Sequence, residues 1–283
     1  MASGVSTLKA GQELPDYRVR AHNSAEESEN KIHSSDVARQ YGFEGGLVPG
    51  VTVYAYMTRP VMEAFGIDWL ERGRMSVRLL KPFYEGQNCI VRATVTQADA
   101  GTARIEVTAS NDEGVICASG VATLGASSPG AIDLAAYPMG ALPGERPPAT
   151  FETLSGIAVL GSPSATYDGA AQGAYLQEAD DSLPLHRGAD APVPSGYLIK
   201  SANAILSLNV RLGPWIHVSS EVEHLGLART GETIETRGRV VGLFERKGHK
   251  FADLDVVMVA GGLRPVMRVQ HTAIYDVRKM AEN

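Results

Sequence analysis

The sequence predicts an α+β fold made of two similar units, each a single helix followed by a long antiparallel sheet. A stretch rich in Gly, Pro and Ala over residues 125–150 has no sustained period and divides the 283-residue chain near its middle. On both sides of it, an apolar helical pattern precedes a series of alternating strands. With 44% hydrophobic residues, the chain can bury two cores of ordinary domain size.

The first unit is predicted to span residues 1–124. Its helix is the apolar run "VTVYAYMTRPVMEAFG", which follows Gly50, and Pro60 within this run predicts a kink or a break. From Met75 onward, apolar and polar residues alternate between turn signals, as they do in antiparallel strands.

The second unit is predicted over residues 151–283, after the linker at 125–150. Its helix is expected in "YLIKSANAILSLNVRLG", which follows Gly196, and its strands begin near His217. Three pairs of positions correspond when the two units are aligned: Gly50 within one residue of Gly196, Gly86 with Gly231, and Arg92 with Arg237. This agreement in order and spacing indicates an internal duplication.

One helix followed by an antiparallel meander allows a sheet to wrap its apolar face around that helix. This is the order of a hotdog fold, and two copies predict a double hotdog. We expect the two sheets to pair edge to edge, because such pairing hides exposed strand edges.

Charge and composition exclude several classes of function. A net charge of -6 gives no basic field for nucleic-acid binding. The two cysteines, Cys89 and Cys117, lack metal-ligand spacing, and no nucleotide-cofactor motif is present. The N-terminus has no apolar leader, and no run is long enough to cross a membrane, so we expect a soluble cytoplasmic protein.

Residues 28–50, "SENKIHSSDVARQYGFEGGLVPG", contain the candidate site of the first unit. His33 is the side chain in this stretch whose ordinary pKa suits proton transfer at neutral pH. Asn30 can orient a water or the imidazole. Gly50 opens the predicted helix and offers a free N–H at the positive end of the helix dipole.

This stretch resembles the signature of the MaoC-like, or R-specific enoyl-CoA hydratase, family and its double-hotdog relatives. That signature runs Asp-x-Asn-Pro-Ile/Leu-His, continues through a short overhanging helix, and ends in Phe-x-x-Pro-Ile-x-His-Gly at the mouth of the central helix. The corresponding segments here are "SENKIH", "VARQYGF" and "GGLVPG". Three residues depart from the signature: Ser28 replaces the catalytic aspartate, Lys31 the proline, and Pro49 the histidine before the glycine.

The resemblance implies a hydratase or dehydratase, a lyase that acts on an enoyl-CoA or 3-hydroxyacyl-CoA. Such a reaction needs a base for water, an acid for the α carbon, and donors for the thioester oxygen. In the first unit the candidates are His33 and Asn30 for catalysis, and Ser28, Gly50 and Tyr54 for substrate binding. Because Ser28 is not an acid, Glu27, Glu29 or a residue from the second unit is needed to complete an acid–base pair.

The second unit contains a partial copy of the motif in "DSLPLHRGADAPVPSG", with Asp181 and His186 as second catalytic candidates and Gly196 as a second binding candidate. His186 lies only ten residues before Gly196, so the overhanging helix is expected to be missing. Leu183 replaces the asparagine. We interpret this unit as a degenerate copy, although a site shared by both halves would use groups from each.

Several alternatives remain open at this stage. His33 can instead cap the short helix that follows, for which Ser34 or Ser35 is a good N-cap, and the "GGLVPG" glycines can serve only a tight turn. Four cations can bind coenzyme A phosphates or lie on a solvated strand face: Arg72, Arg74, Arg78 and Lys81.

The function also has alternatives. These are a hotdog thioesterase and an inactive acyl-thioester-binding protein. The expected partner is a small-molecule acyl thioester, with coenzyme A or an acyl carrier as part of the substrate. We expect no other cofactor and no metal, and a monomer or a homodimer of double hotdogs.

Overall fold

The computed structural model describes residues 8–99, 101–127 and 130–279. The strands in these residues form one antiparallel sheet with the order β1-β3-β4-β5-β2-β7-β10-β9-β8-β6. The first five positions come from the first half of the chain and the last five from the second half. None of the helices in the described ranges has the length and apolar character needed to cross a membrane.

The first half supplies β1 (Tyr17–Arg20), η2 (Lys31–His33), α1 (Ser35–Gln40), α2 (Gly50–Phe65), α3 (Ile67–Arg72), β2 (Gly73–Leu79), β3 (Asn88–Asp99), β4 (Thr102–Ser110) and β5 (Ile116–Leu124). The second half supplies α4 (Phe151–Gly156), β6 (Ser164–Thr166), α5 (Gly169–Glu178), η4 (Pro184–His186), α6 (Ser195–Asn209), β7 (Ile216–His224), β8 (Thr233–Arg246), β9 (His249–Ala260) and β10 (Arg264–Asp276). A further 3-10 turn, η3 (Leu134–Ala136), lies between the halves.

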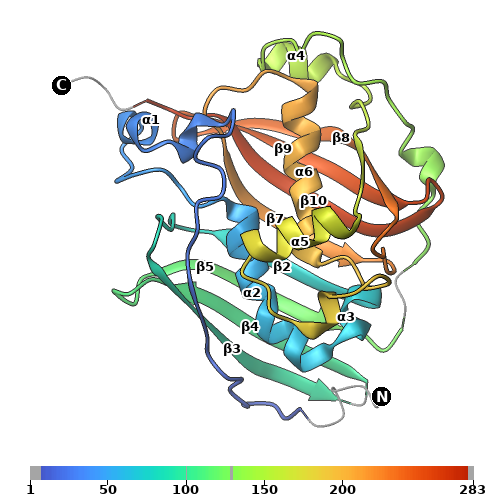
Figure 1. The fold of residues 1–283 in the computed structure, drawn as a ribbon. Helices are drawn as coiled ribbons and strands as arrows, with labels where there is room; N and C mark the ends of the chain where they lie inside the picture. The colour runs from blue at the N-terminus through green and yellow to red at the C-terminus, as the bar shows by residue number, and fades with distance from the viewer. Residues whose placement is uncertain (1–7, 100, 128–129, 280–283) are drawn as a thin grey trace.

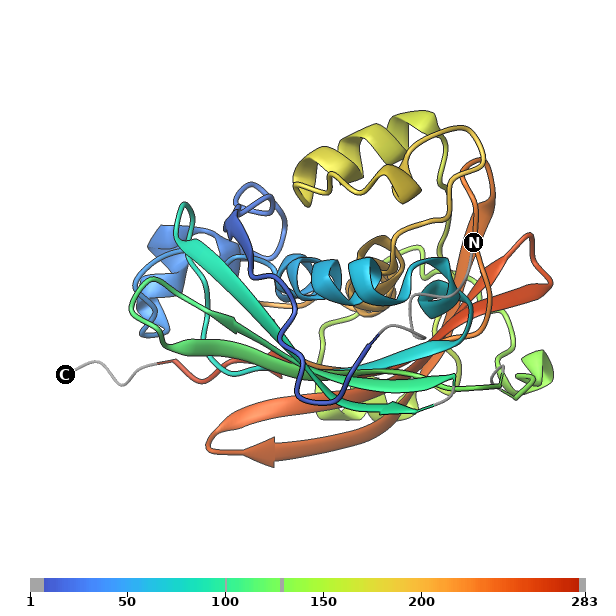
Figure 2. The same cartoon turned by 90° about the horizontal axis from the view of Figure 1, so that it is seen from below.

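The two half-sheets join edge to edge through β2 and β7. These strands pair antiparallel, with Ser76 opposite Glu221 at the centre of the register. The predicted edge pairing is therefore confirmed. Figures 1 and 2 show α2 and α6 on the same side of the combined sheet, with α5 lying over them on the side away from the strands.

The central helices begin where the sequence predicts, at Gly50 and at Ser195, one residue before Gly196. α2 continues through Pro60, so the break considered from the sequence is absent. Where α2 and α6 approach each other, a Cβ on Gly196 would lie 2.8 Å from Ala55 Cβ. A buried hydrogen bond of 2.7 Å between Tyr54 Oη and Ser195 Oγ also joins the two helices.

The segment between the halves packs on the outer face of the second half-sheet. Tyr137 is buried against Val257 and Val259 of β9. Its hydroxyl donates a hydrogen bond of 2.9 Å to Asp255 Oδ2. This Gly- and Pro-rich segment therefore contributes to the packing as well as connecting the two halves.

Candidate functional site

A cavity of about 480 Å³ lies at the N-terminal end of α2, between the two halves. Its lining includes Asn30, His33 and Gly50 from the first half. Much of the remaining wall is apolar and comes from both halves, including Leu47, Leu79, Phe83, Trp215, Phe251 and Ile274. A mostly apolar cavity with a few converging polar groups is the usual form of a small-molecule site.

The Asn30 side chain is held by the backbone of Trp215 in the second half. Asn30 Oδ1 accepts from the Trp215 N–H at 3.1 Å, and Asn30 Nδ2 donates to the Trp215 carbonyl at 3.0 Å. These two bonds fix the orientation of the amide. The remaining Nδ2–H is then directed at His33 Nε2, 3.2 Å away.

The backbone carbonyl of Leu47 fixes the tautomer of His33. His33 Nδ1 lies 2.7 Å from the Leu47 carbonyl oxygen, which only accepts, so Nδ1 carries the proton and Nε2 is the unprotonated nitrogen that faces the Asn30 amide. Burial lowers the pKa of His33 below its ordinary value, although the bond to Leu47 acts in the opposite direction. The ring is therefore neutral at pH 7 and has the form of a general base.

The capping alternative for His33 does not match this geometry. Ser34 holds the N-cap position of α1, but its side chain makes no capping bond. Ser35 Oγ instead accepts from the Gly46 N–H at 3.0 Å. The His33 ring is turned to Leu47 and Asn30 rather than to the helix N-terminus.

Gly50 is the first residue of α2, so its N–H has no partner within the helix. A Cβ at this position would clash with Leu79 Cδ1 and would lie 2.9 Å from His217 Nδ1. A side chain at this position would therefore require the Leu79 and His217 side chains to move. Gly50 lines the same cavity as His33, so the positive end of the helix lies at that cavity.

His217 was not assigned a role from the sequence, yet it lines this cavity. Its Nε2 is 2.9 Å from Ser220 Oγ, which is 2.9 Å from His271 Nδ1, and the two imidazole rings stack at 4.2 Å. Burial lowers the pKa of His217 to about 4. Only the pairing of β7 with β10 brings these three side chains together, and local sequence carries no signal of it.

No carboxylate joins His33 in the cavity. Among the described residues that line it, none is Asp or Glu. Glu29 instead forms an ion pair with Arg146, with Oε2 and Nη1 2.9 Å apart. Ser28 borders a neighbouring groove of about 370 Å³ and donates to the Asn30 carbonyl at 3.4 Å.

Tyr54 lies away from the cavity. Its side chain is fully buried and its hydroxyl bonds to Ser195, so Tyr54 belongs to the contact between the central helices and not to a substrate surface.

The second half contains the acid–base pair that the first half lacks. His186 Nδ1 lies 2.6 Å from Asp181 Oδ2, and Asp181 Oδ1 accepts from the Leu183 N–H at 2.9 Å. Burial alone would raise the pKa of Asp181, but the hydrogen bonds from His186 and Leu183 hold it below its ordinary value.

This pair has almost no space beside it. The adjoining cavity measures only about 20 Å³ and is lined by Tyr175 and Gly196. A Cβ on Gly196 would overlap the Tyr175 hydroxyl, which shows that this side chain fills the mouth of α6. His186 itself is only 3% exposed. The Asp181–His186 pair therefore lies apart from the large cavity.

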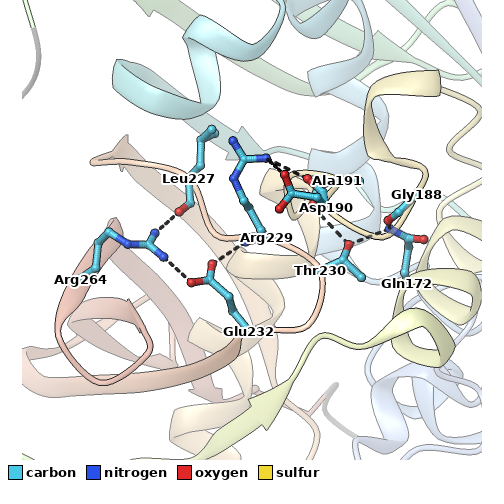
Figure 3. A network of polar contacts seen from close by, with 9 residues as sticks. All are labelled: Gln172, Gly188, Asp190, Ala191, Leu227, Arg229, Thr230, Glu232 and Arg264. Atoms are coloured by element: carbon cyan, nitrogen blue, oxygen red, sulfur yellow. Dashed lines mark hydrogen bonds and ion pairs between the residues drawn. The ribbon is translucent and has the colours of Figure 1, made fainter.

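No helix lies between His186 and α6, as the ten-residue spacing predicts. Figure 3 shows how this short segment is tied to its neighbours. Gln172 of α5 donates to the Gly188 carbonyl at 3.1 Å and to Thr230 Oγ1 at 2.8 Å. Arg229 pairs with Asp190 Oδ2 at 3.0 Å. These contacts fix α5, and with it Tyr175, over the second-half pair.

No protein-family model matches this sequence, and no curated protein matches it. Solved structures do match. One from Chloroflexus aurantiacus, named as a MaoC domain protein dehydratase, has a TM-score of 0.68 and 11% identity and covers 97% of each chain. A conserved protein of Mycobacterium tuberculosis, described as having a double hotdog fold, has a TM-score of 0.65 and 18% identity over 95% of this chain and 97% of that one. The fold is a double hotdog.

An acyl-ACP thioesterase from Bacteroides thetaiotaomicron is also similar in structure, with a TM-score of 0.52 and 10% identity over 92% of this chain and 97% of that one. The predicted fold class is confirmed, and so is the structural likeness to MaoC-like dehydratases. At these identities the likeness concerns the fold, and the chemistry has to be argued from the site itself.

Proposed function

We propose that this protein binds an acyl thioester in the cavity beside His33 and adds water to, or removes water from, the two carbons next to the thioester carbonyl. One observation carries the proposal. A neutral His33 with an unprotonated Nε2 lines the same mostly apolar cavity as the free N–H at the start of α2. The likeness in fold to MaoC-like dehydratases supports this choice of chemistry.

In the hydration direction, the thioester oxygen accepts a hydrogen bond from the Gly50 N–H. The positive end of α2 then stabilises the enolate that forms as water adds. His33 Nε2 takes a proton from the water, the hydroxide adds to carbon 3, and the imidazolium returns the proton to carbon 2. Because one ring performs both transfers, this route does not need the carboxylate that Ser28 replaces.

Asn30 positions the reacting groups in this mechanism. Its amide keeps Nε2 in the unprotonated tautomer, because an N–H donor faces that nitrogen. The incoming water must replace this contact, which at 3.2 Å is longer than the two bonds of 3.0 and 3.1 Å that hold Asn30 to Trp215. Asn30 thus remains in place when the water binds to His33.

Thioester hydrolysis is the second candidate. It needs a base for water and donors for the oxyanion, but no return of a proton to carbon. The absence of Asp and Glu among the described cavity residues favours a reaction with this smaller requirement. The similarity in fold to an acyl-ACP thioesterase supports it as well.

A panel of enoyl-CoA and saturated acyl-CoA thioesters separates these reactions. We expect the enoyl absorbance to fall without release of thiol. Replacing His33 by Ala should lower turnover at least about 100-fold, because a positioned acid–base group contributes roughly 10² to 10⁴ in rate. His22→Ala, at an exposed position outside the cavity, is the control and should keep full turnover.

Each other outcome has a defined meaning. Thiol release from saturated thioesters would show that the protein hydrolyses thioesters and does not hydrate them. Ligand binding without turnover of any thioester would refute an enzymatic function. Normal turnover in His33→Ala would show that His33 is not a catalytic residue.

A further inference from the structure

A few buried polar atoms of the described residues have no hydrogen-bond partner. These side-chain atoms are Tyr167 Oη, His186 Nε2, Asn203 Oδ1, His217 Nδ1 and His271 Nε2. Burying a polar group without a bond costs folding free energy, so native structures keep few such groups. Each of them therefore needs a reason other than packing.

Four of these atoms lie in closed surroundings. His217 and His271 stack on each other, and His217 Nδ1 lies against the start of α2. Tyr167 packs on Tyr197, with ring centroids 4.4 Å apart, and His186 borders the cavity of only about 20 Å³. The remaining atom differs, because its residue lines two larger spaces.

That residue is Asn203 of α6, which lines both the cavity of about 480 Å³ and the neighbouring groove of about 370 Å³. Asn30 and His33 also line both spaces, so the cavity and the groove adjoin at His33. α6 thus brings an amide of the second half to the place where the proposed reaction occurs.

The neighbouring polar side chains on this face of α6 are engaged. Lys200 and Ser207 border the same groove, one turn before and one turn after Asn203. Lys200 Nζ pairs with Glu178 at 2.7 Å, and Ser207 Oγ donates to the Ala204 carbonyl at 3.2 Å. Neither Oδ1 nor Nδ2 of Asn203 bonds to a described residue. This amide is therefore available to a ligand.

The water in the proposed mechanism already has its partners. His33 Nε2 accepts from it, and the Asn30 N–H that faces Nε2 becomes free to donate to the water once the water separates the two groups. The thioester oxygen, in contrast, has only the Gly50 N–H. Sites that stabilise an oxyanion use several fixed donors aimed at the oxygen where charge develops.

We propose that the Asn203 side-chain amide is the second donor to the thioester oxygen, so that one group from each half holds the enolate. This inference rests on the proposed function. Nδ2 donates a hydrogen bond and keeps its proton throughout, because an amide does not titrate. The second half therefore contributes a catalytic group, although its own Asp181–His186 pair lies apart from the large cavity.

Asn203→Leu tests this role, because it replaces the amide by an apolar group of similar size. The kcat for the enoyl thioester should fall at least about 100-fold, since loss of one oxyanion donor costs roughly 10² to 10³ in kcat. KM should stay within about threefold. The melting temperature should not fall, because the variant removes a buried amide oxygen that has no partner.

Ser207→Ala is the matched control. Ser207 lies on the same face of α6 and borders the groove, but it is not among the described residues that line the cavity. This variant should keep the kcat of the unmodified protein.

Asn203→Asp separates a donor to the oxygen from a group that binds the water. The carboxylate keeps the size of the amide, but it accepts hydrogen bonds and carries a negative charge that opposes the enolate. At pH 7 its turnover should be no higher than that of Asn203→Leu. Faster turnover in Asn203→Asp would place this side chain at the water and would overturn the inference.

Infrared difference spectra give a readout that does not depend on turnover. The ligand is S-(2-oxopentyl)-coenzyme A with a ¹³C-labelled ketone carbonyl, in which a methylene group between sulfur and carbonyl prevents hydrolysis. Hydrogen-bond donors lower the stretching frequency of a carbonyl. The band of the bound ketone should therefore lie at higher frequency in Asn203→Leu than in the unmodified protein, and should not move in Ser207→Ala.

Normal kcat in Asn203→Leu, or the same ketone band in Asn203→Leu and the unmodified protein, would overturn the inference. In either case, a large loss of turnover in His33→Ala would leave the proposed function intact. If the unmodified, folded protein neither binds the ketone nor turns over any thioester, the proposed function and the inference both fail.

Discussion

Acidification should destabilise this protein through a histidine in the contact between its halves. His224 of β7 is 1% exposed. Its Nδ1 lies 3.1 Å from the Gly73 carbonyl oxygen and its Nε2 2.9 Å from Ser195 Oγ. Burial lowers the pKa of His224 from 6.5 to about 4. The folded protein therefore stays neutral at this site in a pH range where the unfolded chain becomes protonated.

The sign and size of the effect follow from proton linkage. Below pH 6.5 the unfolded state binds a proton that the folded state does not, so the free energy of unfolding decreases as the pH falls. The loss is complete below about pH 4. Each pH unit corresponds to about 1.4 kcal/mol, so a difference of about 2.5 units gives roughly 3 kcal/mol in total. Between pH 7 and pH 5 the expected loss is about 2 kcal/mol.

Urea unfolding at pH 7, 6 and 5 measures the total loss, to which the buried His217 contributes in the same direction, and the share of His224 is the difference between the unmodified protein and His224→Gln. His224→Gln should be less stable than the unmodified protein at pH 7, but its free energy of unfolding should fall about 2 kcal/mol less on going to pH 5. Ser195→Ala is the matched control. It removes the hydrogen bond to Nε2 and keeps the titrating ring, so it should lower stability at every pH and retain the original slope. Equal slopes in His224→Gln and the unmodified protein would refute the reasoning.

Three further predictions concern Gly50, the Asp181–His186 pair and the pKa of His33. Gly50→Ala should destabilise the fold by about 1–3 kcal/mol, because the added methyl would lie 2.9 Å from Nδ1 of the buried His217 ring. Gly169→Ala at the start of α5, which has open space, should be tolerated in thermal melts. Asp181→Asn should cost about 1–3 kcal/mol by breaking the buried bond to His186, yet leave turnover unchanged. A large loss of turnover in this variant would move the active site to the second half. Because the pKa of His33 is lowered, the acidic limb of the pH profile of kcat/KM should lie below pH 6.5, and a limb above that value would contradict a His33 base.

Most of the fold could be predicted because it is encoded in local patterns that occur twice. The apolar runs after Gly50 and Gly196 predicted both central helices, and the alternating segments predicted the strands. The pairing of β2 with β7 followed from the need to cover strand edges. Of the kink or break predicted at Pro60, the break did not occur, because α2 is continuous from Gly50 to Phe65.

The candidate site was only partly predictable. The spacing of Asn30 and His33 is local, and the structure places both side chains in contact beside one cavity. His217 was not assigned a role because it reaches that cavity through the pairing of β7 with β2 and β10, which joins segments distant in sequence. Tyr54 was expected beside the substrate, but helix packing directs it to Ser195.

The sequence by itself determined the duplicated architecture, the position of each central helix and the two motif copies, because these depend on residue periodicity and short spacings. Only the tertiary structure decided which copy has room for a ligand. Beside the first copy, Gly50 and strands from both halves border a cavity of about 480 Å³. In the second half, the Tyr175 side chain fills the space in front of Gly196 beside an intact Asp181–His186 pair. The volume beside a motif depends on side chains from elements distant in sequence, and the motif itself carries no information about them.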